Sequence, residues 1–564
     1  MKEFFKSNWP YMTLGIIWLL SLASAIFQPS LNDPPVFWSW AQLVHDSPLD
    51  GWDAFFSVWE IKGLLSRCIY YQLYILTNLF VSDFYPYGHF VFTAIGLIEI
   101  TFILACAVYI IPSNFLSKRG KYLLFFISTI AIYSSSAWAN MQPDVWGTVL
   151  LFFSFAILLR NGKMHRIIAG ILLGLLFFVK TPLLLLSGCA FFAYMLVFDK
   201  TLIDTIKDLW LYALSALTTV CLILVTLYFT YPVEIHDIFT LPQVYSNLFC
   251  LRPAEMLSAC NNGVVSLLEL PLHIPIVTLG LISLCVYLST LKLKRNIVML
   301  CVWIFPLLYI VISNAYFYYH YTNLIFPSIL SIYLTYNQCE ILHWKKVIFG
   351  IGILLILGTL CSSSVVYVLL TITHNFLVTI PYILMALAMV EKWRKYAFVI
   401  AILFSTFIFS SFTSGFSYFS RTAHNETVKM VVYNESKGYP IGMQIGNAPI
   451  LHLTDGMSPI WIKNPSYLRE FYPLQIFSSN FMNSQEGIQL EDKILNYDGD
   501  ILIISDDYER RINNTAHLQE IKVFIDENYI PQDTIYQIYS LFELYKKHPI
   551  GHADLFIYQK RITK

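Results

Sequence analysis

The chain has 564 residues, of which 57% are hydrophobic, 16% aromatic and 13% charged. A typical soluble protein carries about 25% charged residues, so this composition excludes an ordinary soluble protein and indicates an α-helical polytopic membrane protein. The 36 basic residues balance the 36 acidic residues and form no basic block, so no nucleic-acid partner is expected.

Apolar windows that can cross about 30 Å of hydrocarbon recur through residues 1–420, which we predict to be the transmembrane domain. A cleaved signal peptide is the alternative for the first window, because residues 23–25 read Ala-Ser-Ala. The thirteen predicted spans are 11–28, 88–111, 122–138, 145–160, 166–180, 182–198, 208–230, 272–291, 296–313, 323–338, 347–369, 375–390 and 396–417.

The distribution of basic residues predicts the orientation, because Lys and Arg in short loops stay on the cytoplasmic side. With the N-terminus inside, 18 of the 22 basic residues of 1–420 fall in cytoplasmic segments. We therefore expect the N-terminus on the cytoplasmic side and the C-terminal domain on the external side. The expected setting is a bacterial inner membrane with this domain in the periplasm, although the charge distribution itself does not specify the organism. The four external cations, each a candidate for binding an anion or for pairing with a nearby acid, are Lys62, Arg67, Lys180 and Arg252.

The first long external loop, residues 29–87, opens with "SLNDPPVFWSWAQ". This stretch places Asp33 before two prolines and three aromatic residues, which prefer the boundary between lipid and water. A free aspartate is ionised at neutral pH, so Asp33 can accept a proton. Further along, apolar residues at three- and four-residue spacing predict an interfacial helix; they are Trp52, Phe55, Phe56, Trp59 and Leu64.

The second long external loop, residues 231–271, holds Cys250 and Cys260, the only two of the ten cysteines that share an external loop. A disulfide between them is expected in an oxidising compartment. No doubled CxxC metal motif occurs. Arg252 in this loop and Glu60 in the first are candidates for an acceptor or loop site.

The tail, residues 421–564, has 14 basic and 18 acidic residues and no spanning window. We predict a small soluble α/β domain on the external face, with strands at 448–454, 498–506 and 553–560 and helices at 516–529 and 533–548. It carries no phosphate-binding loop, nucleophile elbow or metal motif. A role as a lid or acceptor platform is therefore favoured over catalysis.

Several polar residues are predicted at the external ends of spans, where charged groups face a cavity rather than lipid. Asp144 in "ANMQPDVWG" opens the fourth span, Lys180 in "GLLFFVKTP" ends the fifth, and His320 and Tyr321 lie in "NAYFYYHYTN". Cations at these positions are suited to bind the single phosphate of a lipid-linked donor, and a carboxylate is suited to act as a general base. Capping of the fourth helix is the alternative for Asp144, which follows Pro143 in the first turn.

As an ordered set, these motifs resemble the GT-C membrane glycosyltransferases. The set is the external Asp after the first span, "KG" at 62–63, "QPD" opening the fourth span and "AGILLGLLFFVKTP" along the fifth. The likeness is strongest to the branch of the bacterial aminoarabinose transferase of lipid A and the protein O-mannosyltransferases, and covers residues 1–340. It implies inverting transfer of a sugar from a polyprenyl-phosphate donor to a hydroxyl or phosphate of a cell-envelope lipid, glycan or protein.

The resemblance also implies roles for individual residues. Asp33 and Asp144 match the family's catalytic carboxylates, and Lys62 matches the lysine near the donor phosphate. Where family members often carry Asp-Glu, this chain has Asp33 followed by Pro34. No cofactor is specified, and a divalent metal ion with unknown ligands stays open. The full set of donor-phosphate candidates is Lys62, Arg67, Lys180, His320 and Tyr321.

In the implied mechanism Asp33 removes the acceptor proton, while fixed cations stabilise the departing polyprenyl phosphate. One alternative is an oligosaccharide ligase with a polyprenyl-pyrophosphate donor, which would need more external cationic charge. Another is a transporter or flippase of a lipid-linked sugar, which would be expected to show midplane polar groups and paired repeats. The sequence specifies neither the sugar nor the acceptor.

Overall fold

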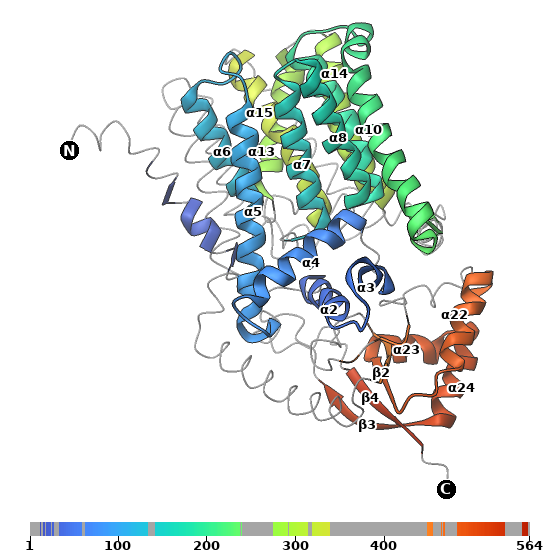
Figure 1. Cartoon of the computed structure of the whole chain (residues 1–564). Helices are drawn as coiled ribbons and strands as arrows, with labels where there is room; N and C mark the ends of the chain where they lie inside the picture. Colours follow the sequence, from blue (N-terminus) through green and yellow to red (C-terminus); the bar gives the residue numbers. More distant parts are fainter. Residues whose placement is uncertain are drawn as a thin grey trace, which may run out of the picture. The chain divides into compact units, whose positions relative to one another are not determined.

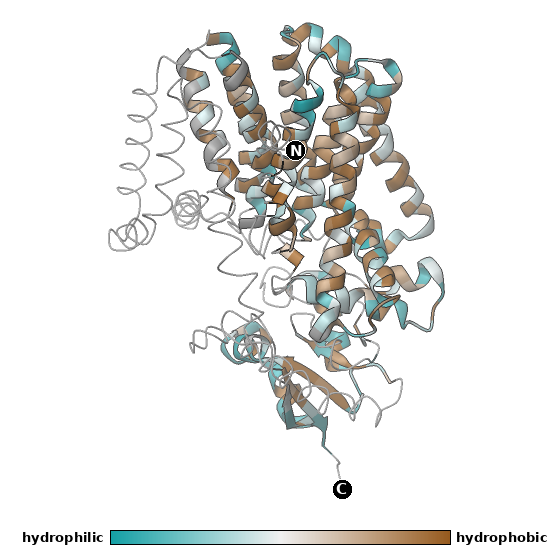
Figure 2. Ribbon diagram, turned by 90° about the vertical axis from the view of Figure 1, so that its left-hand side faces the viewer, coloured by the Kyte–Doolittle hydropathy of each residue, from teal (hydrophilic) through white to brown (hydrophobic). Residues whose placement is uncertain are grey.

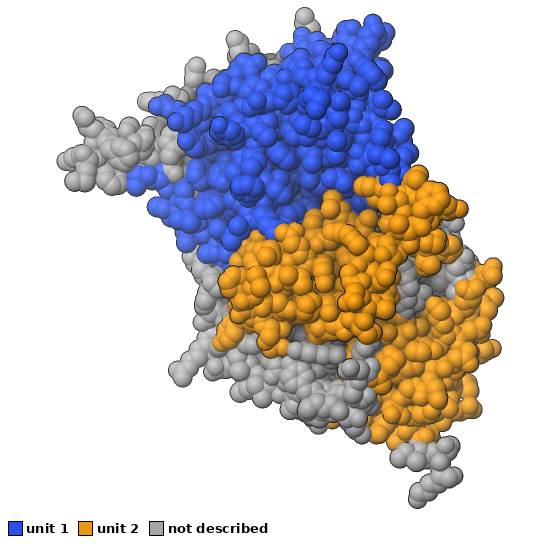
Figure 3. Space-filling model, in the orientation of Figure 1, with its two compact units in different colours: residues 1–28, 96–222, 253–416 blue, residues 29–95, 223–252, 417–564 orange. Residues whose placement is uncertain are grey.

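The computed structural model divides into two compact units, which are coloured separately in Figure 3. Unit 1 comprises Met1–Gln28, Gly96–Leu222 and Pro253–Phe416, and unit 2 comprises Pro29–Ile95, Ile223–Arg252 and Ser417–Lys564. The whole of the first predicted external loop therefore belongs to the same unit as the tail, and the domain boundary at residue 420 stays a prediction. The described residues are 33–58, 63–133, 141–236, 274–290, 293–313, 318–338, 448–454, 482–535 and 555–561, with scattered residues in 12–26, 238–239 and 464–468.

Unit 1 is built from apolar helices, which appear mostly brown in Figure 2. The helices α5 (His89–Ile110) and α10 (Leu202–Thr230) belong partly to unit 2, but most residues of each belong to unit 1. Its other described elements (Figure 1) are α6 (Lys118–Tyr133), α7 (Pro143–Leu158), α8 (Lys163–Val179), η2 (Thr181–Leu185), α9 (Leu186–Val197), α13 (Pro275–Thr290), α14 (Leu293–Ser313), η3 (Tyr318–Leu324) and α15 (Ile325–Gln338).

These apolar helices make the protein an integral membrane protein. Among the described residues, three segments are long and apolar enough to cross a bilayer: α5, α10 and Leu293–Ile310 of α14. Pro143–Leu158 and Thr181–Val197 are apolar but shorter. A helix occupies each predicted window from 88–111 to 323–338. The last three windows lie outside the described residues, so the number of thirteen spans stays a prediction.

Helix α8 packs closely on α10 through two glycines one turn apart. A Cβ atom at Gly170 would lie 2.3 Å from the carbonyl oxygen of Tyr212, and one at Gly174 would lie 2.6 Å from that of Ala216. Small residues at this spacing let two helix backbones approach in a membrane. The packing therefore fixes the axis of α8, which leads directly to Lys180.

Lys180 interrupts the chain between α8 and η2. Its backbone is extended, with φ of −164° and ψ of 120°, and Pro182 follows two residues later. A proline lacks the N–H that the next helical turn requires, and its ring clashes with the preceding turn. The break therefore places Lys180 at the end of α8 instead of along a continuous helix.

The first loop of unit 2 folds as α2 (Asp33–His45), α3 (Gly51–Ser57) and α4 (Leu64–Asn78) rather than as one interfacial helix. The aromatic residues after Asp33 are buried in protein and do not face lipid, as a belt at the lipid–water boundary would. Trp38 and Trp40 are each 1% exposed, and Phe37 stacks on Tyr70 of α4 with ring centroids 3.8 Å apart. They form the protein core that joins α2 to its neighbours.

Among the described residues of the tail, four strands form one sheet in the order β1-β2-β4-β3. β1 pairs parallel with β2, and β4 pairs antiparallel with both β2 and β3. Three strands overlap those predicted, whereas β3 occupies the start of the predicted helix 533–548, because Asp533 to Ile535 pair with β4. The elements are β1 (Leu451–Leu453), α22 (Gln485–Leu495), β2 (Ile501–Ser505), α23 (Asp506–Asn514), η8 (Ala516–Leu518), α24 (Gln519–Asn528), β3 (Tyr529–Ile535) and β4 (Leu555–Lys560).

Strand β1 buries a histidine between two leucines. Side chains alternate along a strand, so Leu451 and Leu453 share one face and enter the helix-covered core, while His452 points to the other face. His452 is 2% exposed, and its burial lowers the pKa to about 3. The folded tail therefore holds a neutral imidazole at and below neutral pH.

We expect the tail to lose stability in mild acid through His452. Below about pH 6.5 the imidazole of His452 binds a proton in the unfolded chain but stays neutral in the folded state. The free energy of unfolding therefore falls as the pH drops from about 6.5 toward 3, by about 2 kcal/mol at pH 5. Protection factors for amide hydrogen exchange in β1 and β2 of the full chain, compared at pH 7 and pH 5, measure this loss. His452→Leu should remove most of the pH dependence; an unchanged dependence would show that another group causes it.

Candidate active site

Asp144 is placed by the start of α7. Met141 has a positive φ of 66°, an uncommon conformation for a residue with a Cβ atom. Gln142 is extended, and Pro143 occupies the first turn, where its fixed φ suits a helix start. Asp144 follows in the same turn and is completely buried.

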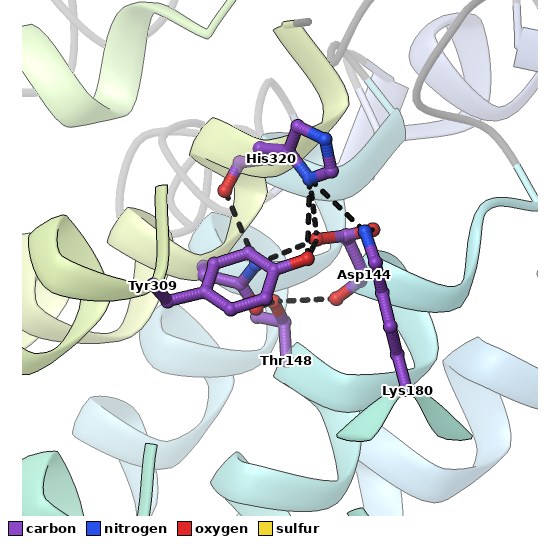
Figure 4. Close-up of polar contacts among 6 residues, drawn as sticks. Asp144, Thr148, Lys180, Tyr309 and His320 are labelled. Atoms are coloured by element: carbon purple, nitrogen blue, oxygen red, sulfur yellow. Dashed lines mark hydrogen bonds and ion pairs between the residues drawn. The ribbon is translucent and has the colours of Figure 1, made fainter. Parts of the chain in front are cut away.

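The carboxylate of Asp144 accepts hydrogen bonds from three other elements (Figure 4). Its Oδ1 atom accepts from the Tyr309 hydroxyl of α14. The same atom lies 3.1 Å from Nδ1 of His320 and 3.0 Å from Nδ2 of Asn323, both on η3. Its Oδ2 atom lies 3.4 Å from the ammonium of Lys180. The network thus joins α7, α14, η3 and the end of α8.

Asn323 and Thr148 complete the network. Thr148 donates 2.9 Å to the carbonyl oxygen of Asp144, one turn earlier in α7, and its hydroxyl lies 3.2 Å from Oδ1 of Asn323. The amide of Asn323 is oriented by its Nδ2 group, which lies 3.0 Å from Oδ1 of Asp144 and 3.1 Å from the carbonyl oxygen of His320. A buried polar network in which the members are hydrogen-bonded holds one arrangement of side chains.

Lys180 is the member of the network that solvent or a ligand can reach. Its side chain is 27% exposed, whereas Asp144 is fully buried. The ammonium lies 3.4 Å from Nδ1 of His320 and 5.3 Å from the centroid of the Tyr309 ring. The buried carboxylate and the ring therefore hold the cation in place while part of its surface stays accessible.

The structure brings together three of the residues singled out from the sequence: Asp144, Lys180 and His320. Tyr321, the neighbouring candidate, is buried on η3. The carboxylate of Asp144 accepts from side chains of other elements, and the residue at the cap position is Gln142, so capping does not account for Asp144. Sequence reasoning missed Tyr309, Thr148 and Asn323, although Asn323 ends the quoted stretch "NAYFYYHYTN".

Arg67 lies elsewhere, in unit 2. Its guanidinium pairs with Glu234, and both side chains are 1% exposed. This contact favours the alternative that Arg67 pairs with an acid over the expectation that it binds the donor phosphate. No pattern in the sequence had indicated Glu234 as the partner of Arg67.

The remaining candidates are only partly within the described residues. Asp33 begins α2, but its side chain lies outside the description. Also outside are Glu60, Lys62, Cys250, Arg252 and Cys260, so the disulfide and the loop sites stay predictions. Among the residues that the structure describes, no group of three or more His, Cys, Asp or Glu residues is placed to hold a metal ion.

Comparison with solved structures identifies the fold. ArnT from Cupriavidus metallidurans in the apo state matches with a TM-score of 0.51 and 10% identity over 98% of both chains. The same protein bound to undecaprenyl phosphate gives 0.48 and 11% over 98% of both chains. Archaeal oligosaccharyltransferase AglB from Archaeoglobus fulgidus, in complex with an inhibitory peptide and a dolichol-phosphate, gives 0.39 and 13% over 92% of this chain and 72% of its own.

No protein-family model and no curated protein sequence matches the chain. At 10% identity the likeness to apo ArnT shows the fold alone. The chain shares the helical fold of apo ArnT, in agreement with the fold that the sequence resemblance implied.

Proposed function

We propose that the protein is an inverting membrane glycosyltransferase that moves a sugar from a polyprenyl-phosphate donor to a hydroxyl or phosphate of a cell-envelope acceptor. The observation that carries the proposal is the Lys180 ammonium, held by Asp144, His320 and Tyr309 among apolar helices. Ionisable groups at membrane depth are costly and usually functional. The shared fold with apo ArnT supports the same class of enzyme.

Lys180 is suited to hold the phosphate of the donor. An ammonium forms charge-assisted hydrogen bonds to phosphate oxygens, and a site shielded from water strengthens them as negative charge builds up on the leaving group. The lipid chain would lie along the apolar helices and supply binding energy remote from the reacting bond.

Asp33 is proposed as the general base for the acceptor. Inversion at the anomeric carbon requires the acceptor to attack from the face opposite the departing phosphate, so the base and the phosphate site must be separate groups. With Asp33 as the base, Lys180 is proposed to bind the phosphate and Asp144 to hold Lys180 in place. The proposed setting is a bacterial inner membrane, with the tail in the periplasm.

Lys180→Ala should weaken binding of a synthetic polyprenyl-phosphate sugar by about 10- to 100-fold, which corresponds to roughly 1.5 to 3 kcal/mol for a hydrogen bond to a charged group. Transfer of sugar should slow as well, because the ammonium also stabilises the leaving phosphate. Asp33→Asn is the contrasting variant: it should lower the transfer rate by about 10²-fold with donor binding retained. Purified variants in detergent, assayed separately for donor binding and for transfer, measure both effects.

Thermal unfolding of each variant controls for loss of the fold. Equal donor binding by the wild type and Lys180→Ala would remove Lys180 from the phosphate site. A wild-type protein that neither binds the lipid-phosphate sugar nor transfers it, to any envelope fraction offered, would overturn the proposed function.

A further inference from the structure

Three charged side chains meet near the starts of α8 and α10, at the end of α8 opposite Lys180. Asp208 of α10 accepts a hydrogen bond from the ammonium of Lys200 through Oδ2, and its Oδ1 atom lies 3.6 Å from Nη2 of Arg166 on α8. Arg166 also donates 2.6 Å to Oδ1 of Asn161 in the turn before α8. Arg166 lies about 20 Å along the helix from Lys180, so this basic cluster is separate from the candidate active site.

The basic cluster, Arg166, Lys200 and Asp208, lies at the end of the close contact between α8 and α10. The two helices run side by side in Figure 1, and a Cβ atom at Gly170 would lie 2.3 Å from the carbonyl oxygen of Tyr212. Arg166 is four residues before Gly170, and Asp208 is four residues before Tyr212, so each lies one turn further along the same helix face. The helix contact therefore fixes the positions of Arg166 and Asp208.

The basic cluster carries one excess positive charge that a ligand can reach. The side chains of Arg166, Lys200 and Asp208 are 15%, 27% and 24% exposed, and the two cations share a single carboxylate. Nε of Arg166 is buried and has no hydrogen-bond partner among the described residues, although a guanidinium has five N–H donors to satisfy. The contacts in this part of the chain therefore do not saturate the two cations.

The charged residues nearby add to the positive charge instead of cancelling it. Asp199 pairs with Arg295 of α14 at 3.2 Å, so that pair has no net charge. The exposed residues around it are one aspartate and four cations: Asp204, Arg160, Lys163, Lys207 and Lys294. The sequence predicts this end of the helices to be cytoplasmic, and the cytoplasmic leaflet carries anionic lipids.

Exposed apolar side chains extend from the basic cluster along both helices. They recur at helical spacing and are Met164, Ile168 and Ile171 on α8 and Trp210, Leu214 and Leu217 on α10. Only 17% of the spanning window of α10 is buried in protein, so lipid chains cover most of this helix. A phosphate bound at the cluster would therefore have room for acyl chains directly beside it.

We propose that the basic cluster binds the headgroup phosphate of an anionic phospholipid between Arg166 and Lys200, with the acyl chains along the exposed faces of α8 and α10. Basic pockets between membrane helices bind such headgroups, and ammonium and guanidinium groups form charge-assisted hydrogen bonds to phosphate. A lipid with one negative charge matches the excess positive charge. A zwitterionic lipid brings a cation of its own, which the cluster repels. The inference does not depend on the proposed enzymatic function.

Lipid binding by the full-length protein tests the proposal. The probes are phosphatidylglycerol, which is anionic, and phosphatidylcholine, which has the same phosphate but no net charge. Native mass spectrometry of the protein in detergent, titrated with each lipid, gives the number of bound lipids and their affinity. We expect the wild type to bind phosphatidylglycerol about 10-fold more tightly, and inorganic phosphate at the same concentration should not displace it.

The variant that removes the site combines Arg166→Gln, Lys200→Gln and Asp208→Asn. It leaves no carboxylate without its cations, and it lowers the net charge of the protein by one. We expect it to bind the two lipids with equal affinity. Thermal unfolding in detergent without added lipid shows whether the variant is folded.

The matched control is Lys118→Gln, which also lowers the net charge by one. Lys118 is exposed at the start of α6. That start lies at the same end of unit 1 as the basic cluster, because Lys121 of α6 and Arg160 donate 2.9 Å and 2.8 Å to the carbonyl oxygens of the last two residues of α5. The control should keep the preference for phosphatidylglycerol.

The wild type also provides a test that needs no variant. Phosphatidylglycerol with a photoreactive group on its headgroup should crosslink to residues 160–166 and 198–208, and peptide mass spectrometry locates the crosslinks. Crosslinks only at other segments would overturn the proposal.

The binding experiment has three further outcomes that would contradict the proposal. One is equal binding of the two lipids by the wild type, and another is a preference that the triple variant keeps. If Lys118→Gln loses the preference as fully as the triple variant does, the lipid is attracted by the charged surface as a whole and no site exists. Displacement by inorganic phosphate at equal concentration would overturn the assignment to a lipid, because the acyl chains would then contribute nothing.

Discussion

Asp144→Asn is expected to lower the rate of sugar transfer by about 10²-fold or more while the helices stay folded. The change keeps the size of the side chain but removes its charge and turns one acceptor into a donor. Oδ1 accepts from Tyr309, His320 and Asn323, and Oδ2 faces Lys180. Whichever way the new amide turns, its NH₂ group meets hydrogen-bond donors or a cation.

Two consequences add to each other in this variant. The Lys180 ammonium loses its anionic partner and can leave the position in which it would meet the phosphate. The imidazole of His320 and the amide of Asn323 lose the carboxylate oxygen that they contact, so the side chains around Lys180 lose their fixed arrangement.

Single-turnover transfer from a polyprenyl-phosphate sugar measures the effect, with circular dichroism to follow the helices. The control is Asp208→Asn in the same unit, where a carboxylate also meets two cations, Lys200 and Arg166. Asp208 lies near the start of α10, away from the network, so its variant should transfer sugar at the wild-type rate. Unimpaired transfer by Asp144→Asn would show that Asp144 only supports packing.

The sequence predicted the helices of unit 1 well because a membrane leaves one dominant signal. Each span must be long and apolar, so hydropathy places α5, α10 and α14 directly. Pro182 and Pro143 likewise mark where helices end and begin, which is why Asp144 and Lys180 could be located at span ends. The contact between Asp144 and Lys180 depends on how α7 and α8 pack. The distribution of basic residues indicated only that both residues lie on the same side of the membrane.

What the sequence could not reveal are residues whose role depends on tertiary packing. Tyr309 lies within an apolar window, where a tyrosine is ordinary. It becomes part of the site only because α14 packs against α9 and η3, which brings its hydroxyl to Asp144. The sequence predicted an interfacial belt of aromatic residues at Phe37, Trp38 and Trp40, but aromatic residues also fill protein cores. Packing against α4 buries them instead. Glu234 follows a long helix as a single charge, and only the fold shows that Arg67 is its partner.

Glu234→Gln is expected to destabilise unit 2 by about 3 to 5 kcal/mol, the usual cost of removing one partner of a buried ion pair. The guanidinium of Arg67 pairs with Glu234 and lies 5.4 Å and 5.9 Å from the ring centroids of Phe55 and Phe56. Ring faces attract a cation but do not neutralise it. The variant therefore leaves a positive charge buried among α3, α4 and the segment that follows α10.

A double variant distinguishes the charge effect from a loss of shape. Arg67→Met combined with Glu234→Leu removes both charges and fills similar volume, and such replacements of buried pairs are often neutral or stabilising. It should recover most of the stability that Glu234→Gln loses. The matched control is Asp498→Asn, which breaks the exposed Lys560 pair of the same unit and should have little effect because exposed ion pairs contribute little.

Unfolding of the full chain in detergent, followed by amide hydrogen exchange in α2 and α4, measures these differences. Trp40 of α2 lies against Phe55 with ring centroids 5.2 Å apart, so protection of α2 reports on the packing that Arg67 shares. We expect the unfolding midpoint to fall in the order wild type, double variant, Glu234→Gln. A Glu234→Gln protein as stable as the wild type would mean that Arg67 finds another neutralising partner, and that the pair with Glu234 does not hold these segments of unit 2 together.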